Sequence, residues 1–185
     1  MNPRAAPILT REMLHPFSAR DVPWLLRQRA EGSAHQPFLI WESFVDDDSM
    51  WTYARFHTTV ELVAANLSAA GVGIGDKVLV HLDNCPEFLF VWFACARLGA
   101  IAVTTNTRCP LDEVEYFARH SRARFAVTQP KYASLVQTCM PGAQRMYLLK
   151  SDPGTKDGTG ITGKYRSIEE VLAAGGPLRA PRTRP

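Results

Sequence analysis

The sequence lacks a hydrophobic run long enough to cross a membrane, and it lacks a strong excess of charge. Its 185 residues have a formal net charge of +3, with 21 lysines and arginines against 18 aspartates and glutamates. A balance this close gives no case for a nucleic-acid partner. Residues 1–17 are interrupted by prolines and contain no apolar segment of signal-peptide length. We therefore expect a cytoplasmic protein without a membrane span.

Cysteine and histidine are few and scattered. The 4 cysteines show no C-x-x-C spacing, and the 5 histidines include no i, i+4 pair. The sequence therefore predicts neither a zinc site nor a redox pair, and we expect buried, reduced thiols. Asp46, Asp47 and Asp48 stand in a row, whereas a metal-binding loop alternates its ligands with spacers. We interpret these three carboxylates as a solvated turn.

The centre of the chain has the pattern of a strand, a buried helix and a second strand. Lys77–Leu82 is a run of β-favouring residues. The helix is predicted to begin at Asn84, with Glu87 three residues later in a variant of the capping box, and to end at Gly99. From Phe88 to Leu98 nearly every residue is apolar, which predicts a helix buried on almost all sides.

The flanking segments extend this alternation. The predicted helices are 21–32, 52–70, 111–120, 131–139 and 167–174, and the other predicted strands are 37–44, 50–56, 124–128 and 146–149. The first two of these strands predict a hairpin, and the rest predict βαβ units with right-handed crossovers. The fold class is therefore α/β, a doubly wound, largely parallel sheet with flanking helices, preceded by a β-hairpin. We expect one domain over 21–176 with a flexible loop at 151–166, an irregular segment at 1–20 and a Pro/Arg-rich tail at 177–185.

Gly158–Lys164 fits the phosphate-binding pattern G-x-x-x-x-G-K up to its last position. A working loop of this kind needs Ser or Thr after the lysine and a strand directly before the first glycine. Tyr165 takes the place of that hydroxyl, and the residues SDPGTKD lie between the preceding strand and the loop. We interpret the segment as a flexible surface loop, with nucleotide binding as the alternative.

Two further groups of residues are candidates for a binding site. His81–Asn84 follows a strand, at the position where open α/β sheets place ligands, so Asp83 and Asn84 could touch a substrate; capping of the next helix is the alternative. The second group could meet the phosphates of a bulky cofactor, or could be a solvated helix end. Its members are Arg119, Arg122, Arg124 and Lys131.

Several short motifs resemble, in order and spacing, those of the adenylate-forming enzymes, the AMP-binding acyl-CoA synthetases. They are Trp51-Thr52-Tyr53, Gly71-Val72-Gly73-Ile74-Gly75-Asp76-Lys77-Val78, Asn84-Cys85-Pro86-Glu87-Phe88, Arg97-Leu98-Gly99-Ala100 and Asn106-Thr107-Arg108. The resemblance covers roughly residues 20–128, and the chain looks like the bacterial ligases similar to crotonobetaine/carnitine–CoA ligase. It departs from the family at Thr104-Thr105, where a proline usually precedes the asparagine.

The resemblance implies a reaction in two steps. A carboxylate attacks ATP to give an acyl-adenylate and pyrophosphate, and coenzyme A then displaces AMP, with magnesium at the phosphates. In the family, the phosphate-binding loop follows a helix similar to Ser167–Ala174, so we expect an N-terminal fragment that is inactive alone. We expect no catalytic, cofactor-binding or metal residue in it. Through its exposed sheet edge, it could form homo-oligomers or aggregate. The alternatives are a non-catalytic interaction module of the same fold and an independent P-loop nucleotide binder.

Overall fold

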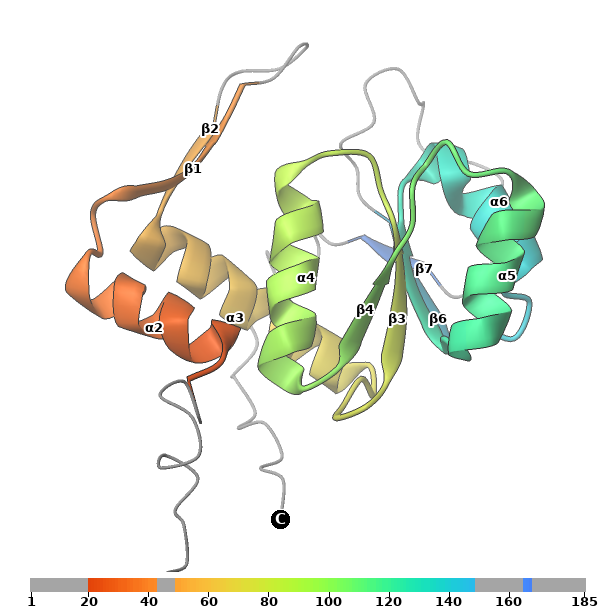
Figure 1. The fold of residues 1–185 in the computed structure, drawn as a ribbon, viewed down its shortest axis with the longest axis horizontal. Helices are drawn as coiled ribbons and strands as arrows, with labels where there is room; N and C mark the ends of the chain where they lie inside the picture. The colour runs from red at the N-terminus through yellow and green to blue at the C-terminus, as the bar shows by residue number, and fades with distance from the viewer. Residues whose placement is uncertain (1–19, 43–48, 149–164, 168–185) are drawn as a thin grey trace, which may run out of the picture.

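A five-stranded, all-parallel sheet forms the centre of the protein (Figure 1). The structure is a computed structural model that describes residues 20–42, 49–148 and 165–167. The strands are β3 (Lys77–His81), β4 (Ile101–Thr104), β5 (Phe125–Thr128), β6 (Arg145–Leu148) and β7 (Tyr165–Ser167). Their order is β4-β3-β5-β6-β7. The predicted parallel sheet is confirmed.

Helices cover both faces of this sheet, as expected for a doubly wound fold. They are α2 (Val22–Gly32), α3 (Tyr53–Ala69), α4 (Pro86–Leu98), α5 (Leu111–Ser121) and α6 (Pro130–Cys139). Figure 1 shows α3 and α4 on one side of the sheet and α5 and α6 on the other. Val78 and Val80 of β3 belong to the core with α3 and α4, whereas Leu79 belongs to the core with α5 and α6. The alternation of side chains along a strand thus buries β3 on both faces.

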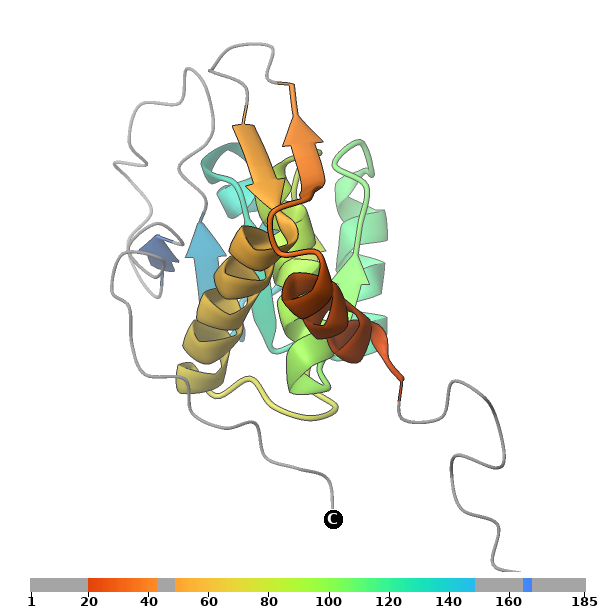
Figure 2. The ribbon, with the colours of Figure 1, turned by 90° about the vertical axis from the view of Figure 1, so that its left-hand side faces the viewer.

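A separate antiparallel hairpin precedes α3. It consists of β1 (Pro37–Trp41) and β2 (Ser49–Thr52), and Figures 1 and 2 show it projecting from the start of α3. The predicted strand 50–56 overlaps the predicted helix 52–70; the strand ends at Thr52, so its bound of 56 is wrong, whereas the helix is confirmed. Thr52 Oγ1 accepts a hydrogen bond from the Arg55 amide at 3.3 Å, so the helix begins at Tyr53. Phe56 then lies inside the helix with its side chain buried.

The start of α4 differs from the predicted capping box. The N-cap is Cys85, with φ −156° and ψ 161°, and Pro86 is the first helical residue. A residue before proline is excluded from the helical region, so Cys85 must stay extended and Asn84 lies outside the helix. The predicted burial of α4 is confirmed only in part: 6 of its 13 residues are buried, and Trp92 keeps 38% of its surface exposed. Gly99 ends the helix with φ 68°, as predicted.

Some sequence predictions lie outside the described residues. They are the segment 1–19, the acidic turn 46–48, the loop Gly158–Lys164, the body of the helix predicted at 167–174 and the tail 177–185. Tyr165 and Arg166 were assigned to a loop and instead form β7, which pairs with β6 in parallel. Among the helices of the described ranges, none combines the length and hydrophobicity needed to cross a membrane.

Candidate functional site

The carboxyl ends of β3, β4 and β5 lie together along the side of the sheet that the strand ends form, which we call the carboxyl edge. In the strand order β4-β3-β5, β3 lies between the other two. The chain leaves β3 toward α4 on one face and leaves β5 toward α6 on the other. Such a switch in the direction of the crossovers opens a crevice at the carboxyl ends, where open α/β sheets bind their ligands. The sequence placed His81–Asn84 at this edge, and the structure confirms that position.

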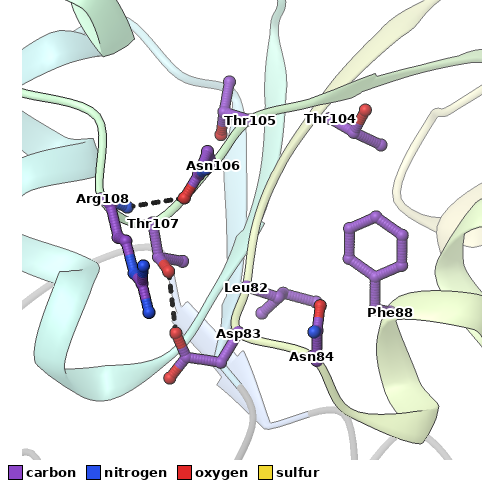
Figure 3. Close-up of a pocket in the computed structure, with 9 residues that line it drawn as sticks. All are labelled: Leu82, Asp83, Asn84, Phe88, Thr104, Thr105, Asn106, Thr107 and Arg108. Atoms are coloured by element: carbon purple, nitrogen blue, oxygen red, sulfur yellow. Dashed lines mark hydrogen bonds between the residues drawn. The ribbon is translucent and has the colours of Figure 1, made fainter.

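A pocket of about 550 Å³ opens at this edge (Figure 3). Its lining comes from the end of β4, the first turn of α4 and the segments that follow β3 and β4: Leu82, Asp83, Asn84, Phe88, Thr104, Thr105, Asn106, Thr107 and Arg108. The volume is in the range of small-molecule sites. Leu82 and Phe88 supply apolar surface, and most of the rest is polar. We call this cavity the edge pocket.

The Asp83 carboxylate is bonded to groups from two other segments. Its Oδ1 accepts hydrogen bonds from Thr107 Oγ1 and from the Tyr132 hydroxyl, each at 2.8 Å. Its Oδ2 lies 2.5 Å from Lys131 Nζ. The Asp83 amide donates to Gln129 Oε1 at 3.1 Å. Partial burial alone would raise the pKa of Asp83, but the hydrogen bonds from Lys131, Tyr132 and Thr107 outweigh it and lower the pKa, so the carboxylate is ionised.

His81 is fully buried beside this carboxylate. Its Nδ1 lies 2.8 Å from Thr105 Oγ1, and that hydroxyl donates to the Val80 carbonyl at 3.3 Å. The Nδ1–H tautomer is compatible with both contacts, because the ring then donates to Thr105 Oγ1 while the hydroxyl donates to Val80. His81 Nε2 has no partner among the described residues. Burial lowers the pKa of His81, although the Asp83 charge opposes this, and the ring is neutral.

The predicted basic cluster does not form. Arg119 pairs with Glu115 on α5 at 3.7 Å, and Arg122 is the helix C-cap with φ 57°. Arg124 lies just before β5 and pairs with Asp76, which lies just before β3. Lys131 lies after β5, at the carboxyl end of that strand, whereas Arg124 lies at its amino end. A shared phosphate site is not supported, because β5 separates Arg124 from Lys131, and the positions of Arg119 and Arg122 at the end of α5 fit the alternative of a solvated helix end.

The cysteines agree in part with the expectation of buried thiols. All four are free; Cys95 and Cys139 are buried, and Cys85 and Cys109 are half-buried. Burial raises the pKa of Cys85 and of Cys95 to about 12, so both remain thiols at neutral pH. Within the described ranges, no group of three or more His, Cys, Asp or Glu side chains is arranged to hold a metal ion.

Sequence reasoning missed the partners of Asp83 and His81. Thr105 and Thr107 appeared only in the comparison with the family motifs, and Gln129 and Tyr132 were not singled out. The available signal was position, because each follows a strand and the carboxyl ends of neighbouring parallel strands meet at one edge. What the sequence does not show is which strands are neighbours.

Comparisons with known proteins agree with this fold. The family model described as AMP-binding enzyme matches residues 26–175. The crotonobetaine/carnitine–CoA ligase of Citrobacter koseri is 37% identical over 103 residues, which are 56% of this chain and 20% of that protein. The ligase of the same name from Proteus mirabilis is 35% identical over 99 residues, 54% of this chain and 19% of that protein.

A solved structure extends the likeness in fold beyond these segments. The N-terminal domain of FACL13 from Mycobacterium tuberculosis superposes with a TM-score of 0.66 and 24% identity, over 89% of this chain and 38% of that one. At this identity the superposition supports the fold alone. The matched part of this chain spans about a fifth of the curated relatives' length.

Proposed function

This chain belongs to the AMP-binding enzyme family, and from that premise we propose that it forms the N-terminal part of an ATP-dependent acyl-CoA synthetase. The observation that carries the proposal is the family match over residues 26–175. The reaction would join a small carboxylate to coenzyme A through an acyl-adenylate, with release of AMP and pyrophosphate. We also propose that the protein is cytoplasmic.

The edge pocket supports a role in holding a substrate of this reaction. Carboxylate, ATP and coenzyme A are all anions. Arg108 and Asp83 are the charged side chains in the lining, and Lys131 offsets the charge of Asp83. Within the described part of the chain, Arg108 forms no ion pair. Its guanidinium is therefore available to an anionic group.

The chain by itself is proposed to be inactive, because its matched part spans only about a fifth of the length of the curated ligases. Catalysis at a phosphoryl group depends on cations and backbone donors positioned around the phosphates. We expect the purified chain to show no carboxylate-dependent exchange between ATP and labelled pyrophosphate, with carnitine and crotonobetaine as the carboxylates. Exchange above the carboxylate-free background would contradict this expectation.

A chimera tests the family role directly. Residues 20–148 of this chain replace the matching part of the Proteus mirabilis ligase, and the chimera is assayed for exchange and thioester formation. We expect a folded, active enzyme, in which Arg108→Ala lowers kcat/KM about tenfold, the order expected for loss of one charge-assisted contact. Arg119→Ala is the matched control, since Arg119 lies outside the edge pocket and pairs with Glu115. A folded but inactive chimera would overturn the proposal.

A further inference from the structure

We propose that Asp83 is a positioning residue, which fastens the segment 106–108 and the start of α6 to the end of β3 and so fixes one wall of the edge pocket. This inference deepens the proposed function, because the wall in question carries Arg108. Its test needs no enzymatic activity, so the two proposals can fail separately.

The first support for this role is that Asp83 does not cap α4. A polar side chain between a strand and a helix usually bonds to the free amides of the first helical turn. Here the N-cap is Cys85, and the helix has no side-chain cap hydrogen bond among the described residues. Helix capping therefore does not account for Asp83.

The second support is where the Asp83 carboxylate directs its bonds. Thr107 belongs to the connection after β4, and Lys131 and Tyr132 belong to the first turn of α6. One carboxylate thus joins the exits of β3, β4 and β5. All three contacts involve an ionised acceptor, which makes each stronger than a bond between neutral groups.

The third support is the local structure of the pocket wall. The Arg108 amide donates to Asn106 Oδ1 at 2.9 Å (Figure 3). The Cys109 amide donates to the Asn106 carbonyl at 3.0 Å. These bonds make residues 106–109 a tight turn. Thr107 lies inside it, so holding the Thr107 hydroxyl holds the whole turn and orients Arg108.

A separate anchor lies just before this turn. Thr105 is buried; its amide donates to the Val80 carbonyl at 3.1 Å, and its hydroxyl contacts His81. These contacts do not involve Asp83. Loss of the Asp83 carboxylate is therefore expected to loosen the turn after Thr105 while leaving β3 and β4 paired.

Hydrogen exchange on the chain itself tests the proposal. In Asp83→Asn, the amides of Arg108 and Cys109 should exchange about tenfold faster than in the wild type, as expected when charge-assisted bonds are lost. The amides within β3 and β5 should keep their rates. Asp76→Asn is the matched control, because it removes a carboxylate just before β3, at the opposite edge of the sheet.

Variants of Thr107, whose hydroxyl donates to Asp83, distinguish a positioning role from a general loss of stability. Thr107→Val should reproduce the faster exchange of Asp83→Asn, and Thr107→Ser, which keeps the hydroxyl, should restore the wild-type rate. Unchanged exchange in Asp83→Asn, or an equal increase throughout β3 and β5, would overturn the proposal. Equal behaviour of the Val and Ser variants would overturn it as well.

Discussion

At the scale of single residues, His81 is the side chain whose chemistry depends most on its surroundings. It is 0% exposed, and its Nδ1 is satisfied by Thr105. A second proton on Nε2 would place a charge and an unpaired donor in the core, which is costly. Burial therefore favours the neutral form of the imidazole.

This predicts a pH dependence of stability that belongs to His81. The pKa of His81 in the folded chain is lowered from 6.5. As the pH falls, the unfolded chain therefore binds a proton at His81 before the folded chain does. The stability from neutral His81 is thus present above the unfolded pKa and is lost toward acid pH. Urea unfolding between pH 8 and pH 5 should show a steeper loss of free energy in the wild type than in His81→Leu.

The comparison of slopes separates this effect from lost packing. His81→Leu also removes the bond to Thr105 and is expected to be less stable at every pH, but that offset does not alter the slope. His35→Gln, which removes an exposed imidazole, is the matched control. Equal slopes for wild type and His81→Leu would refute the assignment.

At the scale of elements, the end of α4 depends on one glycine. Gly99 has φ 68°, a conformation that residues with a Cβ rarely adopt. A Cβ at this position would also lie 3.2 Å from Cγ1 of Ile74. The turn thus relies on glycine both for its backbone angle and for the approach of the segment before β3.

Gly99→Ala is therefore expected to lower the free energy of unfolding by about 1–2 kcal/mol, the cost of a left-handed L-residue. Chemical denaturation measures this directly. Gly32→Ala provides the contrast, because Gly32 ends α2 with nothing within 4 Å of an added Cβ. Gly32→Ala should raise the free energy of unfolding by up to about 1 kcal/mol. A loss in Gly32→Ala as large as that in Gly99→Ala would argue against the left-handed strain.

The two ends of α4 also show how far local signals reach. Gly99 was predicted to end the helix and does so. Asn84 and Glu87 matched a capping box, but Pro86 restricts the residue before it and moves the start to Cys85. The motif failed because a stronger backbone constraint acts within the same four residues.

At the scale of the whole molecule, the sheet ends at β4 within the described part of the chain. β4 pairs with β3 on one side only, and Ile101 at its start is 49% exposed. Unpaired backbone groups beside exposed apolar side chains are a template for association. We therefore expect the isolated chain to self-associate.

Sedimentation over a range of protein concentrations would reveal this association. Ile101→Lys should shift the distribution toward monomer, because a charge on an edge strand opposes pairing with another copy. Leu111→Lys is the matched control: Leu111 is 46% exposed but lies at the start of α5 and not on a strand. A monomeric wild type, or an equal effect of both variants, would contradict β4 as the site of association.

The sequence by itself determined the kind of fold and the ends of most elements. Asp21 caps α2, Thr52 caps α3 and Gly99 ends α4, each through contacts within a few residues. The alternation of strands and helices then favoured a parallel sheet, and the family motifs pointed to the family that the comparisons show. These features depend on residues that are close together in the sequence, so they can be predicted without knowing the strand order.

Only the tertiary structure decided which side chains meet. Asp83 lies 46 residues from Gln129 and 49 from Tyr132 in the sequence, and the strand order brings them together. Arg124 and Lys131, by contrast, are kept apart by β5 itself, because they lie at its opposite ends. The site at the carboxyl edge is therefore a product of strand order, because local preferences form each strand but only packing selects its neighbours.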